Sequence, residues 1–273
     1  MGYGTLRTSQ TGAVLRAVLD ANDINVITWQ LMMDLNELLD KLANDETVKI
    51  VVFESAVKDF FSAHLDLRPD AESKMPPMHP DYPNLIYFMG LMQKLSTVPV
   101  VTIALVEGRA RAGGLDFMMA CDMRFGVKDR AIVAPIEARV SLMSASIPAF
   151  INHMGLGRAS EWFYSGHDMD AEAAEKYGIL NRSFATSKEA KDYVDGYCAT
   201  VGKLPRHNLR EMKQYVAKRM YPLGSMEEIN NRFVSLLQSE ETAKLIPKLM
   251  ELAPSGYGEE ELNLSEVLMK AHE

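Results

Sequence analysis

The stretch from Val98 to Asp122 reads VPVVTIALVEGRARAGGLDFMMACD, and it is the most informative part of the chain for the fold. Its first part, Val98–Val106, is an apolar run with proline near its start, as expected for a buried parallel strand. The pair Gly113-Gly114 lets the backbone turn tightly and approach a ligand closely. Leu115–Ala120 then favours a helix, with Asp116 in its first turn, where an acid interacts favourably with the helix dipole. A strand, a glycine turn and a helix start together present free backbone N–H groups to developing negative charge.

Other interpretations of this turn are possible. A dinucleotide-binding turn needs the pattern G-x-G-x-x-G, and Ala110 and Ala112 do not fit that pattern. A phosphate loop needs glycine followed by lysine and serine or threonine, and this stretch has none. A tight strand-to-helix turn without chemistry is the structural alternative.

A second segment, Phe60–Asp66, reads FFSAHLD and follows a β-branched and aromatic run, Val48–Phe53, that predicts a buried strand. Small residues followed by a polar turn place backbone N–H groups at the end of that strand. By itself the segment is typical of many α/β proteins. Its order and spacing relative to the Gly113-Gly114 turn make it informative.

Short strand-like runs alternate with helical stretches in the rest of the first half. Leucines recur at helical spacing from Leu31 to Leu42, and Thr28 is the expected N-cap of that helix. The segment Arg68–Asn84 contains five prolines, which predict a surface loop without regular structure. Further strands are predicted at Ala13–Leu19, Met123–Val127 and Ala131–Ala134.

From Ala159 onward the pattern is nearly all helical. The stretch Ala171–Tyr177 closes at Gly178, which suits the C-terminal glycine of a helix. Met226–Leu252 carries apolar residues at helical spacing, with a break expected at Pro247. The fold class is therefore α/β, with a core in residues 1–204 and a helical region in residues 205–273.

Composition narrows the class of function. A net charge of −8 argues against broad binding to nucleic acid, which needs a basic surface. No run of roughly 18 apolar residues occurs, so no membrane span is expected, and the first residues lack the apolar core of a signal peptide. Cys121 and Cys198 give neither a disulfide framework nor metal-ligand spacing, and they suit a reducing cytoplasm. The 18 methionines suit either a deformable apolar pocket or ordinary core filling.

Several motifs together resemble the crotonase (enoyl-CoA hydratase/isomerase) superfamily. FFSAHLD is similar to its F-x-A-G-x-D segment, and Val98–Asp122 is similar to its strand, G-G-x-E turn and helix ending in C-D. Ser146-Ile147-Pro148 resembles its T-I-P turn, and Ser165–Ala174 resembles its T-G-x-x-x-x-A-x-x-A helix. The match runs in order from about Ala13 to Phe184, and this many motifs in register are a specific signal.

The resemblance implies a spiral of β-β-α units whose C-terminal helices serve oligomerisation, as a homotrimer or a dimer of trimers, and cover the site as a lid. It implies an oxyanion hole formed by the backbone N–H groups of Leu65 and Gly113, with Asp116 as the catalytic acid. The ligand is an acyl-CoA thioester, whose coenzyme A is part of the substrate; no separate cofactor and no metal are implied. Ala63 falls where the family's backbone meets the adenine of coenzyme A. The positions assigned to substrate binding are Ala63, His64, Asp66 and Gly114.

The chain departs from the family's pattern at three places. Asp116 is one methylene shorter than the usual glutamate, which sets its carboxylate back by roughly 1–1.5 Å. His64 replaces a glycine, so it is strained if that position needs a positive φ. Glu137 stands one place later than the second glutamate of hydratases, so that either Glu137 enters the site after a local shift or Ile136 takes its place.

The expected function is an enoyl-CoA hydratase or isomerase that stabilises a thioester enolate, with Asp116 as the general acid/base and Glu137 as a second catalytic acid if it enters the site. One alternative is decarboxylation or thioester hydrolysis, which needs one acid or a positioned water. The other alternative is a catalytically silent acyl-CoA-binding subunit. The acyl group itself is not encoded in any motif that we find.

Overall fold

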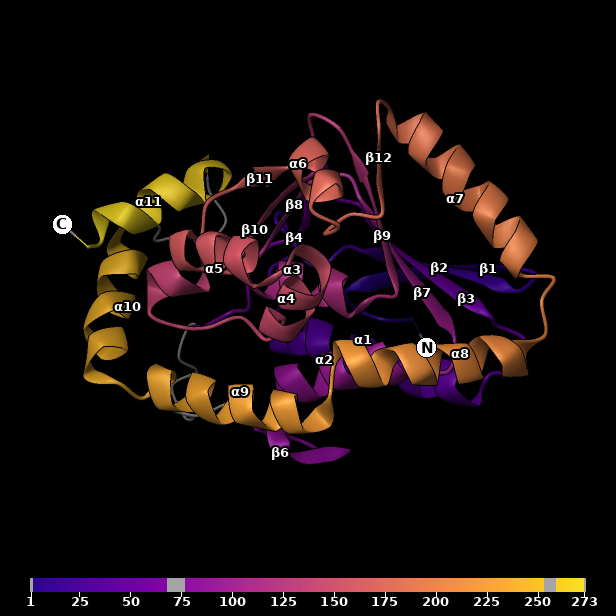
Figure 1. The fold of residues 1–273 in the computed structure, drawn as a ribbon, viewed down its shortest axis with the longest axis horizontal. Coiled ribbons are helices and arrows are strands. Elements are labelled where there is room, and N and C mark those ends of the chain that lie inside the picture. The colour runs from indigo at the N-terminus through magenta and orange to yellow at the C-terminus, as the bar shows by residue number, and fades with distance from the viewer. Residues whose placement is uncertain (1, 68–76, 253–258, 273) are drawn as a thin grey trace.

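The computed structural model describes residues 2–67, 77–252 and 259–272, and Figure 1 shows its course. The larger sheet has the strand order β1-β2-β3-β7-β9-β12. Strand β1 runs antiparallel to β2, and every other neighbouring pair in this sheet is parallel. The strands are β1 (Leu6–Thr11), β2 (Val14–Leu19), β3 (Ile50–Ser55), β7 (Val101–Val106), β9 (Met123–Val127) and β12 (Arg182–Phe184).

A second sheet has the order β11-β10-β8-β4, with β4, β8 and β10 parallel to one another. Its strands are β4 (Phe60–Ser62), β8 (Arg109–Arg111), β10 (Ile132–Ala134) and β11 (Met169–Asp170). Three strands of the larger sheet are each followed by a strand of the second sheet: β3 by β4, β7 by β8 and β9 by β10. The chain therefore winds as a spiral that contributes one strand to each sheet per turn.

Helices fill the turns of this spiral. They are α1 (Trp29–Asn44), α2 (Tyr87–Thr97), α3 (Gly113–Ala120), the 3₁₀ turn η1 (Ile136–Val140), α4 (Ile147–Met154), α5 (Leu156–Ser165) and α6 (Ala171–Lys176). Thr28 caps α1, because its side chain accepts a hydrogen bond from the N–H of Leu31. Gly178 follows α6 with φ of +79°, the left-handed conformation that a helix end favours.

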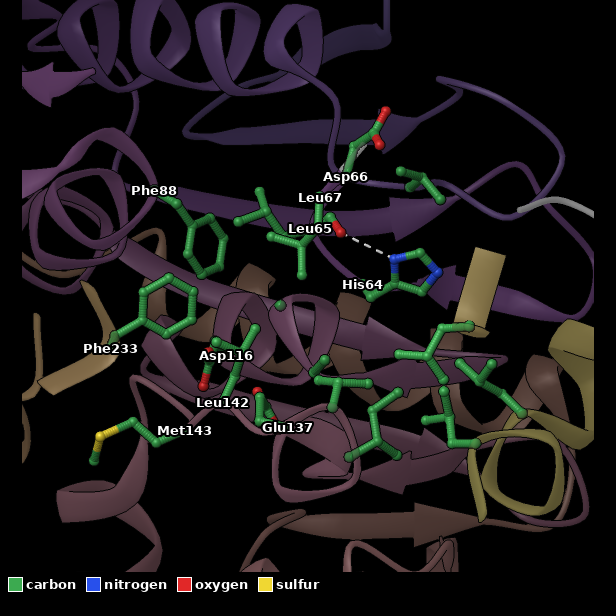
Figure 2. A pocket seen from close by; sticks show the side chains of 18 of the residues that line it. His64, Leu65, Asp66, Leu67, Phe88, Asp116, Glu137, Leu142, Met143 and Phe233 are labelled. Carbon is green, nitrogen blue, oxygen red and sulfur yellow. Dashed lines mark hydrogen bonds between the residues drawn. The ribbon is translucent and has the colours of Figure 1, made fainter. Parts of the chain in front are cut away.

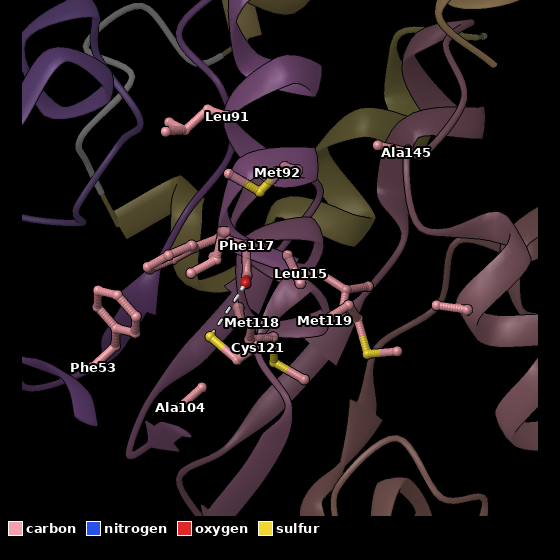
Figure 3. Packing of buried hydrophobic residues seen from close by; sticks show 14 of the residues in the cluster. Phe53, Leu91, Met92, Ala104, Leu115, Phe117, Met118, Met119, Cys121 and Ala145 are labelled. Atoms are coloured by element: carbon pink, nitrogen blue, oxygen red, sulfur yellow. Dashed lines mark hydrogen bonds between the residues drawn. The ribbon is translucent and has the colours of Figure 1, made fainter. Parts of the chain in front are cut away.

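Helix α3 is the centre of the core, and all eight of its residues are buried. Figure 3 shows its apolar side chains among residues from β3, β7 and α2. The rings of Phe53 and Phe117 meet edge to face, with centroids 5.1 Å apart. Because α3 is surrounded by packed side chains, its N-terminus and Asp116 are held in a nearly rigid place.

The C-terminal helices run along one side of the spiral and then turn back over its end (Figure 1). They are α7 (Ser187–Val201), α8 (Arg206–Met220), α9 (Leu223–Leu237), α10 (Glu240–Leu252), the 3₁₀ turn η2 (Glu259–Asn263) and α11 (Leu264–Lys270). None of the helices in the described part of the chain combines the length and the apolar character needed to cross a bilayer.

The α/β class and the predicted spiral are confirmed, but one strand was missed and three local predictions are wrong. Leu6–Thr11 is a strand that was not predicted. A hairpin of β5 (Met78–His79) and β6 (Tyr82–Ile86) occupies part of the predicted loop, and the rest of that loop, residues 68–76, lies outside the described residues. Strands β11 and β12 also interrupt the region predicted to be nearly all helical.

The fourth correction concerns Pro247, which lies inside α10 and does not end it. The helical break falls earlier, at Ser239, whose hydroxyl accepts a hydrogen bond from the N–H of Thr242 and so starts a new helix. Proline removes one backbone hydrogen bond, but Leu245 is buried and Ile246 contacts a cavity, and this apolar packing keeps the helix continuous. The proposed division of the chain near Leu204-Pro205 falls between α7 and α8 and stays a prediction.

Candidate active site

A cavity of about 240 Å³ lies where the loop after β4, the start of α3, η1 and the C-terminal helices meet. Its walls are mostly apolar, and Figure 2 shows Phe88, Leu142 and Phe233 around it. Its polar side chains are few, and all are titratable: His64, Asp66, Asp116, Glu137 and Glu261. An apolar cleft with a few convergent polar groups is the usual form of a small-molecule site.

Leu65 and Gly113 both line this cavity, and the backbone segments that carry them are in close contact. A Cβ atom added to Gly113 would lie 3.0 Å from the backbone nitrogen of Leu65. Among the described residues we find no acceptor for the N–H of either residue, whereas the neighbouring amides of Asp66 and Gly114 donate to Ile27 and Ala63. Two unpaired amides side by side on a cavity wall form an anion-binding arrangement.

The conformation of Ala112 sets the direction of the Gly113 amide. Ala112 has φ of +45° and ψ of −119°, a combination that costs a non-glycine residue of the order of 1–3 kcal/mol. Its N–H donates to the carbonyl of Ala134 and its carbonyl accepts from the N–H of Asp116, so both neighbours hold it in place. The sequence signal at this turn is the glycine pair that follows, and it did not reveal the strain at Ala112.

Gly114 and Ala63 do not line the cavity; they pack against each other behind it. The N–H of Gly114 donates to the carbonyl of Ala63 over 2.7 Å. A Cβ on Gly114 would lie only 1.9 Å from the carbonyl oxygen of Ser62, so this position excludes any side chain. Gly114 therefore brings α3 against β4 and does not itself contact the cavity. The adenine contact assigned to Ala63 stays a prediction.

His64 lines the cavity without backbone strain, because it is not among the residues with positive φ. Its Nδ1 lies 3.0 Å from the carbonyl oxygen of Leu65, and its Nε2 lies 3.2 Å from Oε1 of Glu261. Burial opposes protonation of the imidazole, but the hydrogen bond and the charge of Glu261 outweigh it and raise the pKa of His64. His64 and Glu261 therefore form a hydrogen-bonded pair on the cavity wall. Asp66, the remaining predicted position, also lines the cavity.

The carboxyl group of Asp116 is buried and well hydrogen-bonded. Ser144 donates its hydroxyl to Oδ1 over 2.6 Å, Ser146 donates its N–H to the same oxygen over 3.0 Å, and Ala145 donates its N–H to Oδ2 over 3.1 Å. Burial raises the pKa of Asp116 above its ordinary value, and these hydrogen bonds partly oppose that rise. All three donors come from residues 144–146, next to the Ser146-Ile147-Pro148 motif that was identified in the sequence. The contacts of Ser144 and Ala145 with Asp116 were not predicted.

The side chain of Glu137 lines the cavity. The sequence had left open whether Glu137 or Ile136 takes this place. The 3₁₀ turn η1 and the left-handed Ser141 accommodate the displaced register, so Ile136 and Glu137 both line the cavity. No other described residue donates a hydrogen bond to either carboxyl oxygen of Glu137, and only its own backbone N–H lies near enough to lower the pKa of the group. Burial raises the pKa of Glu137 well above its ordinary value, and the charge of Asp116 raises it further. Figure 2 shows both carboxyl groups on the cavity wall.

The two carboxyl groups thus share one site with different environments. Asp116 has three donors that favour its ionised form, whereas no other described residue donates to Glu137, so a proton shared by the two groups is favoured on Glu137. Glu261 is a further acid of the site that sequence reasoning missed, because no motif marks it. No group of three His, Cys, Asp or Glu side chains within residues 2–67, 77–252 and 259–272 is arranged to hold a metal ion.

The spiral fold, with paired amides and buried acids beside an apolar cavity, agrees with the crotonase resemblance of the sequence motifs. The sequence model of the enoyl-CoA hydratase/isomerase family matches residues 10–248, and the chain belongs to this family. Among solved structures, a putative enoyl-CoA hydratase from Streptomyces avermitilis is 30% identical with a TM-score of 0.90, and the alignment covers 98% of this chain and 97% of that one.

Curated relatives are more distant and differ in the reactions that their names give. Enoyl-CoA hydratase domain-containing protein 2 of Mus musculus is 28% identical over 62% of this chain and 56% of its own length. Methylglutaconyl-CoA hydratase of the same species is 23% identical over 67% of this chain and 58% of its own. The 4-chlorobenzoyl coenzyme A dehalogenase-1 of an Arthrobacter species is 28% identical over 59% of each. The chain thus spans less than two thirds of these relatives, and the comparisons leave the reaction open.

Proposed function

We propose that this protein is an enoyl-CoA hydratase, which adds water across the double bond next to a thioester carbonyl. One observation carries the proposal: Asp116 and Glu137 share a buried site but have opposite hydrogen-bonding environments. Hydration needs a base for the water and an acid for the α-carbon at the same time. A pair of carboxyl groups whose environments separate their pKa values supplies one of each.

In this mechanism the thioester oxygen accepts hydrogen bonds from the amides of Leu65 and Gly113. These fixed donors fit the negative oxygen of the enolate better than the neutral carbonyl, and one donor of this kind contributes about 3–4 kcal/mol. Two observations support this role. The backbone segments of Leu65 and Gly113 are in close contact, and among the described residues neither N–H group has an acceptor.

Ionised Asp116 takes a proton from water as the water oxygen bonds to the β-carbon. Its three donors occupy three of about four acceptor positions, which leaves one on Oδ2 for the water. The electron pair of the double bond takes the proton of Glu137 at the α-carbon. The proton gained by Asp116 then returns to Glu137 before the next turnover, so the enzyme is regenerated.

Isomerisation of a 3-enoyl thioester to a 2-enoyl thioester is the second candidate, and one observation favours it. No other described residue donates to either oxygen of Glu137, so both oxygens can take part. In this reaction Glu137 starts ionised: one oxygen removes a proton from the α-carbon, the carboxyl group delivers that proton to the γ-carbon, and the carboxylate is regenerated. This chemistry needs only Glu137 and the two amides, and Asp116 then has an electrostatic role.

The test is turnover by the purified protein of crotonyl-CoA and of a 3-enoyl-CoA, followed by ultraviolet absorbance of the conjugated thioester. Hydration removes the absorbance of crotonyl-CoA, and isomerisation creates it from the 3-enoyl compound. Asp116→Asn is expected to lower hydration by about 10²–10⁴-fold but to spare binding of butyryl-CoA. The control is Glu266→Gln, which changes an exposed acid on α11. If wild-type protein turns over neither thioester, yet releases free coenzyme A or carbon dioxide from other acyl-CoA compounds, hydrolysis or decarboxylation replaces this proposal. Binding without any turnover leaves the silent subunit.

The homotrimer implied by the resemblance is also a proposal. Helix α8 carries Met212, Tyr215 and Val216 at helical spacing, and each has more than half of its surface exposed (66%, 62% and 51%). An apolar stripe of this kind supports contact with another copy of the chain. Light scattering after size exclusion measures the mass, and Tyr215→Lys is expected to lower it.

A further inference from the structure

The C-terminal tail, residues 259–272, forms part of the wall of the proposed active site. Leu264, Val267 and Leu268 line the cavity beside Glu261. The family's sequence model ends its match at residue 248, so this part of the wall lies outside the matched region. The tail is therefore a candidate for a substrate contact that lies outside the part of the chain matched by the family's sequence model.

Buried contacts fix the tail in place. Arg111 on β8, which is 1% exposed, binds Asp168 through Nε over 3.0 Å and through Nη2 over 2.6 Å. The same guanidinium donates to the backbone carbonyl oxygens of Glu261 and Leu262. A rigid two-pronged donor on two successive carbonyls determines the position of Glu261.

The side chain of Glu261 is 2% exposed, yet only one of its oxygens has a partner among the described residues. Its Oε1 lies 3.2 Å from Nε2 of His64, and its Oε2 receives no hydrogen bond from them. A buried carboxylate oxygen without a donor costs free energy, and an ionised carboxylate can only accept hydrogen bonds. The ligand group that satisfies it must therefore be a hydrogen-bond donor.

We propose that Glu261, held by His64 and Arg111, is a substrate-binding residue that accepts a hydrogen bond from a donor group of the bound acyl-CoA thioester. The inference rests on the proposed function in one respect, namely that the cavity binds such a thioester. Close to the thioester, donors occur in two parts of the ligand: a hydroxyl on the acyl group, where the acyl group has one, and the amide N–H and hydroxyl groups of the pantetheine arm. Because the surrounding wall is apolar, a ligand without the donor leaves Oε2 unpaired and binds more weakly.

The experiment compares wild-type protein with Glu261→Met, which keeps an unbranched side chain of similar length but cannot accept the hydrogen bond. The matched control is Glu266→Met, the same change at an exposed position of α11. Dissociation constants are measured by calorimetry, or by competition for weak ligands, with butyryl-CoA, 4-hydroxybutyryl-CoA, S-butyryl-pantetheine and S-propyl thiobutyrate, which lacks amides. None of these saturated thioesters is a substrate for hydration.

Loss of a hydrogen bond to a charged group is expected to weaken binding about tenfold or more. A loss confined to 4-hydroxybutyryl-CoA assigns the donor to the acyl group. A loss for every thioester that contains amides, but not for S-propyl thiobutyrate, assigns it to the pantetheine arm. Unchanged binding throughout, or an equal loss that includes S-propyl thiobutyrate, overturns the proposal, because Glu261 then has only a structural role.

Two outcomes distinguish a failure of this inference from a failure of the proposed reaction. If the selective losses occur while crotonyl-CoA is not hydrated, the reaction is wrong and the subsite stands. If wild-type protein binds none of the thioesters, both are overturned. Should Glu261→Met fail to fold in a thermal melt, Glu261→Gln gives the same comparison with a loss of about threefold, because a neutral acceptor forms a weaker hydrogen bond.

Discussion

Replacing Glu137 by glutamine gives the sharpest test of the site, because activity and stability are expected to change in opposite directions. The substitution keeps the size of the side chain but removes its transferable proton. General acid catalysis by a positioned carboxyl group contributes about 10²–10⁴-fold, and hydration of crotonyl-CoA is expected to fall by that factor. Binding of butyryl-CoA is expected to stay unchanged.

The stability effect follows from the pKa of Glu137, which is higher in the folded protein than its ordinary value of 4.5. Between those two pKa values the folded state binds more protons than the unfolded state. The free energy of unfolding of the wild type therefore decreases as pH rises, by up to about 1.4 kcal/mol per pH unit for this group. The glutamine side chain does not titrate, so the Glu137→Gln variant gains stability relative to wild type as pH rises above about 4.5, until the folded-state pKa is passed.

The assay is urea unfolding of both proteins at equal concentration from pH 5 to pH 8, together with the pH dependence of hydration. The wild type needs Asp116 ionised and Glu137 protonated, so its rate falls on both sides of an optimum set by the coupled pair. The hydrogen bonds of the glutamine amide change the difference in stability by a constant amount but not its slope with pH. A difference in stability that is flat with pH, or a variant with full activity, would refute the assignment of Glu137 as the buried acid.

Three other predictions follow from individual contacts. Ser144→Ala removes the 2.6 Å hydrogen bond that favours ionised Asp116, so the pKa of that carboxyl rises. The acidic side of the pH profile of hydration is expected to move up by about one to two pH units. If it does not move, Asp116 is not the base. Gly114→Ala places a methyl 1.9 Å from the carbonyl oxygen of Ser62, so a loss of about 3 kcal/mol of unfolding free energy is expected in urea titrations, and wild-type stability would contradict this packing. Arg111→Met removes the ion pair with Asp168 and the donors to the carbonyls of Glu261 and Leu262. The expected cost is about 2 kcal/mol, because Asp168 is one-third exposed and keeps the hydrogen bond from Ser265. Limited proteolysis is expected to cut the C-terminal tail first, and equal cleavage rates would show that the tail has other anchors.

Much of the fold was predictable from local patterns in the sequence. Apolar runs marked β2, β3, β7 and β9, and leucine spacing with Thr28 marked α1 and its start. The Gly113-Gly114 turn was informative because only glycine fits against Ser62 at position 114, and a side chain at position 113 would be tight against Leu65. Patterns of this kind survive in a single sequence because periodicity and steric exclusion act within a few residues. The missed strand β1 is polar and largely exposed, so its sequence carries no burial pattern.

The chemistry of the site depended on contacts that no local pattern records. Glu261 meets His64 across 197 positions of the chain, and its place is set by the packing of the tail against β8. The sequence left open whether Glu137 or Ile136 faces the cavity. Both residues lie in η1, and both line the cavity. The order of residues was therefore enough to assign the family, the α/β spiral and the two loops that carry Leu65 and Gly113. Which acids share the cavity, and which of them lack partners, followed only from the packed chain, because burial and hydrogen bonding arise between segments that are distant in sequence.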